Sequence, residues 1–129
     1  MNGNLLDTSV LIARGGSTEL TLPEAAAISV ITLGELRAGV LIARDHTVAM
    51  LRGRRLVAIR AAFAPLPVDE SVAERYGEVL AVARSERRTV KATDLLIIAT
   101  AAATERVLYT LDSAQARLAQ AAGVAATTL

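Results

Sequence analysis

The sequence has 129 residues, of which 53% are hydrophobic and only 2% aromatic. This length predicts a single domain over residues 1–129, with a core built from Ala, Val, Leu and Ile. The absence of cysteine excludes disulfides, a thiol nucleophile and a Cys-ligated zinc site. The net charge of +1 excludes the strong basic excess of a dedicated nucleic-acid binder, so any nucleic-acid contact has to come from local patches.

Two apolar stretches bear on where the protein resides. The opening segment MNGNLLDTSVLIAR has no basic region ahead of its apolar run, so it does not resemble a signal peptide. The longest uncharged apolar run, residues 95–104, is about half the length that spans a bilayer. We therefore expect a soluble cytoplasmic protein with no membrane partner.

The first half of the chain predicts two strands and three helices. In the order strand, helix, strand, helix, helix they cover residues 3–6, 9–14, 25–30, 32–43 and 47–63. Gly15 and Gly16 are expected to end the first helix, and residues 17–24 are expected to form a loop. Both strands are continuous apolar runs, which is typical of strands buried on both faces of a sheet.

In the second half, Pro65 and Pro67 break the chain around a short extended segment that ends at Val68. Asp69 or Ser71 can cap the helix that follows. The elements then predicted are two helices, a strand, a helix and an edge strand, at residues 72–87, 93–103, 107–110, 112–123 and 124–127. Strands that alternate with helices predict an α/β fold with a central, mostly parallel sheet, whose ligands bind at the carboxyl ends of the strands.

Four acidic residues stand out by position. Asp7 and Asp112 follow predicted strands and are therefore expected at the carboxyl edge of the sheet. Asp94 begins the most apolar helix of the chain, and Glu35 lies on a helical face of apolar or small neighbours. Converging carboxylates need a compensating cation, and oxygen ligands suit Mg²⁺ or Mn²⁺. The four acids are thus candidates for a metal-dependent site for phosphoryl chemistry.

Each acid also has a purely structural interpretation. Aspartate is a favoured N-cap, so Asp7, Asp94 and Asp112 can each cap a helix without binding anything. Glu35 lies close in sequence to Arg37 and Arg44 and can pair with either, or extend its carboxylate to water. These alternatives stay open at the level of the sequence.

Four segments resemble a known family when they are taken in order. They are LLDTSVLI with Asp7, ITLGELRAGV with Glu35, ATDLLIIATA with Asp94 and LYTLD with Asp112. In order and spacing they are similar to the four acidic segments of PIN-domain ribonucleases, and the short chain resembles the VapC toxins of VapBC toxin–antitoxin pairs. The resemblance implies an RNase H-like α/β/α sandwich, one or two Mg²⁺ or Mn²⁺ ions held by the four acids, and endonucleolytic cleavage of RNA by an activated water.

The resemblance also implies roles for three hydroxyl side chains beside the acids. Thr8, Ser9 and Thr110 are expected to orient the carboxylates or a water, although they can equally be turn and cap residues. The chain departs from the family after LYTLD, where family members often carry a further acid. Here the segment is SAQARLA (residues 113–119), with Gln115 at its centre, so a fifth acidic ligand is not expected.

Basic side chains gather in two clusters, which are Arg52, Arg54, Arg55 and Arg60, and Arg84, Arg87, Arg88 and Lys91. The second cluster leads directly to Asp94 and is the candidate for contact with RNA phosphates, although basic residues are also common at solvated helix ends. The resemblance further implies a cognate VapB-like antitoxin and a homodimer.

Two other functions are alternatives to the ribonuclease. A phosphoryl-accepting receiver domain has similar length and form, but it needs paired acids after its first strand and an acceptor Asp after a middle strand. This chain has one acid after the first strand, and Val30 ends the next. The remaining alternative is a catalytically inactive PIN-like scaffold that binds RNA or a partner.

Overall fold

The computed structural model describes residues 3–14 and 23–129. Its sheet has five strands, β1 (Asn4–Leu6), β2 (Ala26–Ser29), β3 (Pro65–Leu66), β4 (Val107–Thr110) and β5 (Ala126–Thr128). The strand order is β3-β2-β1-β4-β5, and every neighbouring pair is parallel. The predicted α/β class is confirmed, and the sheet is parallel throughout rather than mostly so.

The helices of the described residues are α1 (Thr8–Arg14), α2 (Val30–Leu41), α3 (His46–Ala62), α4 (Glu70–Ser85), α5 (Ala92–Ala103) and α6 (Ser113–Ala121). Helix α2 begins at Val30 and not at residue 32, because the Ser29 hydroxyl caps it by accepting from the Ile31 amide at 3.0 Å. The predicted helix end at Gly15 and Gly16, and most of the loop over residues 17–24, lie outside the described residues.

Helix α4 was predicted over residues 72–87, and both of its ends differ. It starts at Glu70 because Asp69 caps it, accepting from the Val72 amide at 3.0 Å. It ends at Ser85 because Arg87 adopts a left-handed backbone with φ 55°. This conformation lets the Arg88 amide donate to the Ala83 carbonyl at 2.9 Å and turns the chain toward α5.

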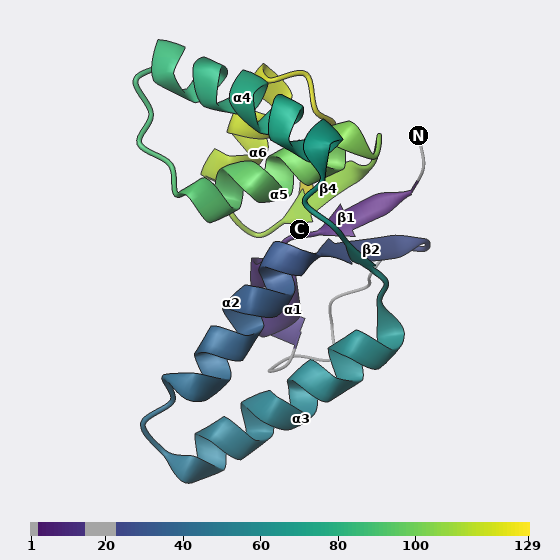
Figure 1. Ribbon diagram of the computed structural model, residues 1–129, viewed down its shortest axis with the longest axis vertical. Helices are drawn as coiled ribbons and strands as arrows, with labels where there is room; N and C mark the ends of the chain where they lie inside the picture. Colours follow the sequence, from purple (N-terminus) through teal and green to yellow (C-terminus); the bar gives the residue numbers. More distant parts are fainter. Residues whose placement is uncertain (1–2, 15–22) are drawn as a thin grey trace.

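The two faces of the sheet carry separate cores, since neighbouring residues of a strand point to opposite faces. Leu5 and Leu108 pack with buried residues of α4, α5 and α6, whereas Leu6 and Ile28 pack with residues of α1, α2 and α3. Figure 1 shows the two helical layers on either side of the strands. The sandwich predicted from the sequence is therefore present. Among the described residues, no helix combines the length and apolar character that a membrane crossing requires.

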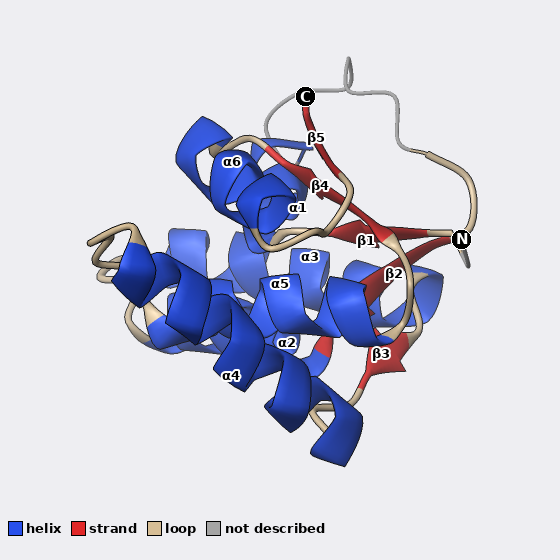
Figure 2. Cartoon of the chain, turned by 90° about the horizontal axis from the view of Figure 1, so that it is seen from above, coloured by secondary structure: helices blue, strands red, loops and turns tan. Residues whose placement is uncertain are grey.

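The strand register determines what meets at the carboxyl edge. Leu6 of β1 pairs with Tyr109 of β4, and the Asp7 amide donates to the Tyr109 carbonyl at 2.8 Å. Asp7 and Thr110 therefore follow adjacent positions of two neighbouring strands. Helices α1 and α6 begin within three residues of these strand ends, and the two neighbouring strands are seen edge on in Figure 2. The ends of β1 and β4 and the starts of α1 and α6 therefore lie together at the carboxyl edge of the sheet.

Candidate active site

Asp7 lies at the end of β1, is only 5% exposed, and has hydrogen-bond donors on both of its carboxylate oxygens. Its Oδ2 accepts from the Ser9 hydroxyl at 2.6 Å and from the Ser9 amide at 3.2 Å. Its Oδ1 accepts from the Gln115 side-chain amide at 3.3 Å. The protein therefore holds this carboxylate between Ser9 on one oxygen and Gln115 on the other.

Thr110, at the end of β4, joins this network. Its hydroxyl oxygen lies 3.2 Å from Asp7 Oδ2 and 2.7 Å from Gln115 Oε1, and it accepts from the Asp112 amide at 3.0 Å. Thr110 and Gln115 are both buried. Buried polar groups of this kind are stable only when they are paired, so the network has few alternative arrangements.

Glu35 lies in the second turn of α2 and faces α1. Its Oε1 accepts from the Thr8 hydroxyl at 2.7 Å, and Thr8 lies 3.0 Å from the Thr32 hydroxyl. Glu35 forms no ion pair with Arg37 or Arg44, so the pairing considered from the sequence is wrong for these described residues. Thr8 orients this acid toward the edge of the sheet.

Asp94 lies in the first turn of α5, but it does not cap that helix. The N-cap is Lys91, which makes no side-chain cap bond, and no described residue donates a hydrogen bond to the Asp94 carboxylate. Burial raises the pKa of Asp94, and the charges of Asp7, Glu35 and Asp112 raise it further, against a lowering by Lys91. The capping interpretation of Asp94 is therefore wrong.

Asp112 does cap a helix, as the structural alternative proposed. Its Oδ1 accepts from the amides of Ala114 at 2.9 Å and Gln115 at 3.2 Å at the start of α6. Its charge nevertheless contributes to the raised pKa of Asp94. A cap and a place in the acidic group are thus compatible, because the amides use one of its two oxygens.

The four acids fit a hard divalent cation by chemistry, since all their donor atoms are carboxylate oxygens. Over residues 3–14 and 23–129, however, no three Asp, Glu, His or Cys side chains are gathered closely enough to hold a metal ion by themselves. Asp7, Glu35 and Asp112 each accept hydrogen bonds from protein donors, whereas the Asp94 carboxylate accepts none from the described residues. The arrangement leaves a concentration of negative charge centred on Asp94.

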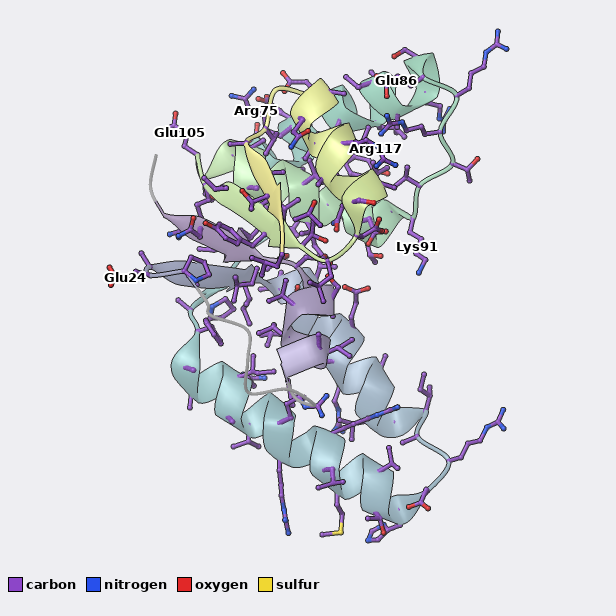
Figure 3. The ribbon with its side chains drawn as sticks, turned by 180° about the vertical axis from the view of Figure 1, so that it is seen from behind. Glu24, Arg75, Glu86, Lys91, Glu105 and Arg117 are labelled. Atoms are coloured by element: carbon purple, nitrogen blue, oxygen red, sulfur yellow. The ribbon has the colours of Figure 1, made fainter. Side chains whose placement is uncertain are left out.

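A pocket of about 390 Å³ opens beside Asp94 and Asp112. Arg88 and Lys91 also line it, and the Lys91 side chain is labelled in Figure 3 on the segment that leads into α5. Arg84 and Arg87 line a separate pocket of about 350 Å³, which shares Arg88. The turn after α4 therefore divides the basic cluster, and only two of its four members border the acids.

Gln115 was not identified as a functional residue from the sequence. The segment after Asp112 drew attention only because it lacks a further acid. The side chain of Gln115 is 4% exposed and contacts both Asp7 and Thr110. The sequence signal that could have identified Gln115 is its place as a polar residue in the first turn of α6, the helix that begins at the same edge of the sheet as Asp7.

Comparisons with known proteins place this chain in a family. The family model of the PIN domain matches residues 5–121. The chain is 45% identical to Ribonuclease VapC8 of Mycobacterium tuberculosis over 100 residues, which cover 75% of this chain and 88% of the relative. It is 35% identical to Ribonuclease VapC5 of the same organism over 125 residues, covering 93% and 90%.

Solved structures agree with these sequence relatives. The crystal structure of VapBC-5, a member of the VapBC family of toxin–antitoxin systems from Mycobacterium tuberculosis, contains a chain that matches with a TM-score of 0.87 and 33% identity over the whole of both chains. A chain of FitAcB from Neisseria gonorrhoeae matches with a TM-score of 0.78 and 30% identity over 96% of each. The family model, the sequence relatives and the solved structures agree, and the chain belongs to the PIN domain family, among the VapC ribonucleases.

Proposed function

We propose that this protein is an endoribonuclease toxin whose activity requires a divalent cation held by Asp7, Glu35, Asp94 and Asp112. The observation that carries the proposal is the state of Asp94. Its carboxylate has no hydrogen-bond donor among the described residues, and burial and three other acids raise its pKa. Such a group lacks a compensating positive charge, which Mg²⁺ or Mn²⁺ would supply.

Three of the acids have carboxylate oxygens that can bind such a cation. Asp94 offers two oxygens that no described residue occupies, and Asp112 offers Oδ2 while its Oδ1 caps α6. Thr8 fixes Oε1 of Glu35, which leaves Oε2 free toward the edge. Because no three acids enclose a site alone, we infer that RNA phosphate and water complete the ligand set.

The proposed reaction is hydrolysis without a covalent intermediate. When bound, a divalent cation lowers the pKa of a water and offsets the charge that develops on the phosphate. The water oxygen attacks phosphorus in line, a carboxylate of the edge accepts its proton, and the bond from phosphorus to the leaving oxygen breaks as that oxygen takes up a proton from solvent. Asp7 is held by Ser9 and Gln115, so it keeps its place while charge moves.

Lys91 and Arg88 are proposed to bring the RNA backbone to this edge. Both line the pocket that contains Asp94 and Asp112, and phosphate contacts from basic side chains set the position of a nucleic acid. Arg88 is partly engaged, because its Nε pairs with Glu86 at 3.0 Å. Lys91 is therefore the stronger candidate of the two, whereas Arg84 and Arg87 line a separate pocket that contains none of the four acids.

We also propose a partner of the kind named for the solved relatives, a cognate antitoxin of the VapB type. Helices α1, α2 and α3 carry the exposed large apolar side chains of Ile12, Leu41, Leu51 and Val57, and Ile42, directly after α2, is exposed too. A pocket of about 420 Å³ between these helices has Glu35 in its wall, together with Arg52 and Arg55. An antitoxin segment in this groove would reach the acids. A homodimer is the expected oligomer, and sedimentation of the chain alone and with its antitoxin tests both contacts.

The activity is tested by incubating the purified protein with total RNA in Mg²⁺, in Mn²⁺ and in EDTA, and mapping the new ends. We expect new ends in either cation, none in EDTA, and none with Asp94→Asn. Cleavage that persists in EDTA would contradict the metal requirement. RNA binding without any new ends would favour the inactive scaffold, the alternative to which the lack of a closed three-acid group points.

A further inference from the structure

Gln115 is a buried, uncharged side chain that contacts the Asp7 carboxylate, alongside the Thr110 hydroxyl. Its Nε2 donates to Asp7 Oδ1 at 3.3 Å, and its Oε1 lies 2.7 Å from the Thr110 hydroxyl. Only 4% of the residue is exposed. A glutamine placed this way connects the first turn of α6 to the end of β1, across 108 positions of the chain.

The available protons determine which end of the Gln115 amide faces Asp7. The Thr110 oxygen accepts from the Asp112 amide, so its single proton is free to be donated, and Gln115 Oε1 is its nearest acceptor at 2.7 Å. Asp7 can only accept, so the amide of Gln115 has to present its nitrogen to that carboxylate. Both ends of the amide are therefore used, and a rotated amide would lose the bond to Asp7, because its oxygen would then face the carboxylate.

We propose that Gln115 is a positioning residue that fixes the Asp7 carboxylate for the divalent cation, an inference that rests on the proposed function. Ser9 donates to Oδ2 of Asp7 and Gln115 donates to Oδ1, so rotation of the carboxylate about the Cβ–Cγ bond would break both hydrogen bonds. Gln115 does this with a neutral donor, which adds no negative charge to an edge that already has four acids. Partners that orient a metal-binding carboxylate commonly contribute about 10- to 100-fold to metal affinity or activity.

The substitution Gln115→Met tests this because methionine is also unbranched and has nearly the same length, but forms neither hydrogen bond. The matched control is Gln120→Met on the same helix, since Gln120 is exposed and donates only to the Ala126 carbonyl at 3.0 Å. Mn²⁺ affinity, measured from free Mn²⁺ by electron paramagnetic resonance, and the cleavage rate are compared in proteins that show the same circular dichroism. We expect Gln115→Met to lose about 10- to 100-fold in both, and Gln120→Met to match the wild type.

A second variant separates positioning from packing. Gln115→Glu keeps an acceptor for Thr110 but places a carboxylate against Asp7 Oδ1, so like charges meet at the present 3.3 Å contact. We expect Gln115→Glu to melt below the wild type in EDTA and to gain more from Mn²⁺ than the wild type does. A side chain that only fills space would make the two substitutions alike in their response to the cation.

The contact between Gln115 and Asp7 can also be tested by NMR of the metal-free protein, without the Gln115→Met variant. The side-chain amide resonances of Gln115 in the wild type should shift when Asp7 is replaced by Asn, whereas those of Gln120 should not. Unshifted Gln115 resonances would overturn the contact itself. A wild type that cleaves RNA and binds Mn²⁺, beside a folded Gln115→Met that does both equally well, would overturn this inference alone. A wild type that does neither would overturn the proposed function and this inference with it.

Discussion

Asp7 and Asp94 are the same residue type, and the charge of Asp7 raises the pKa of Asp94, yet the protein surrounds the two side chains differently. Asp7 receives hydrogen bonds from Ser9 and Gln115 on its two oxygens. Asp94 receives none from the described residues, and burial and neighbouring acids raise its pKa. Because an unpaired, partly buried carboxylate destabilises a folded protein, Asp94 is expected to lower the free energy of unfolding in the absence of a cation. The comparison teaches that one acid is built into the scaffold while the other is left for a ligand.

The largest expected effect is on RNA cleavage. Asp94→Asn removes a charge that no described residue bonds, so the fold should persist while the cleavage rate falls by more than about a hundredfold, the upper end for partners that merely orient a ligand. Glu35→Gln and Asp112→Asn should also weaken cleavage strongly. Glu74→Gln, an exposed acid on the outer surface of α4, is the control. An Asp94→Asn variant that cleaves as well as the wild type would remove Asp94 from the mechanism.

The next effect is on thermal stability in the presence of metal. Wild type should be stabilised by about 2.7 kcal/mol when Mg²⁺ or Mn²⁺ is at a hundredfold excess over its dissociation constant. Asp94→Asn should gain much less, and in EDTA at neutral pH it should melt above the wild type. A raised pKa means that the Asp94 contribution favours folding below the ordinary value of 3.8 and is lost as pH rises through the folded value. The advantage of Asp94→Asn should therefore vanish in acid.

Asp7→Asn should lower the stability of the metal-free protein, the opposite of the effect expected for Asp94→Asn. An asparagine presents one acceptor and one donor where the carboxylate presents two acceptors, so either Ser9 or Gln115 loses its partner. A buried polar group left unsatisfied costs about 1–3 kcal/mol of unfolding free energy. Denaturant melts in EDTA should thus show Asp7→Asn below the wild type and Asp94→Asn above it. Variants that move together would mean that the two aspartates have equivalent surroundings.

The smallest expected effect concerns the exposed Lys91 next to Asp94. Lys91→Ala should raise KM for RNA by at most about fivefold, because an exposed charge contact contributes about 1 kcal/mol or less. The effect should shrink as salt is added. Arg60→Ala, on α3, serves as the control. An unchanged KM at low salt would exclude Lys91 from RNA binding.

Much of the fold followed from local patterns in the sequence. The strand Val107–Thr110 has the predicted bounds, and the other strands and helices lie within two residues of theirs, apart from the start of the extended segment at β3, which was not predicted. The displaced helix ends have local causes in the caps of Ser29 and Asp69 and in the left-handed Arg87. Propensity places a helix well, but a single capping side chain decides where it starts.

The candidate site was only partly predictable. The ends of the predicted strands and the order of the acids predict Asp7 and Asp112 at the carboxyl edge of the sheet. The difference between Asp7 and Asp94 was not predictable, because it depends on Gln115, which meets Asp7 across 108 positions of the chain. Thr8 and Glu35 likewise meet only when α1 packs beside α2. Contacts of this kind are set by packing and leave little trace in local sequence.

The most direct test of the account is a carboxyl-carbon NMR titration of Asp94, in EDTA and again with saturating Mg²⁺. In EDTA the account predicts a pKa above the ordinary value of 3.8, because Asp94 is partly buried among like charges. With Mg²⁺ the pKa should fall, because a bound cation stabilises the ionised carboxylate. A pKa that stays at its ordinary value in EDTA and ignores Mg²⁺ would contradict the claim that Asp94 is the acid left open for a cation.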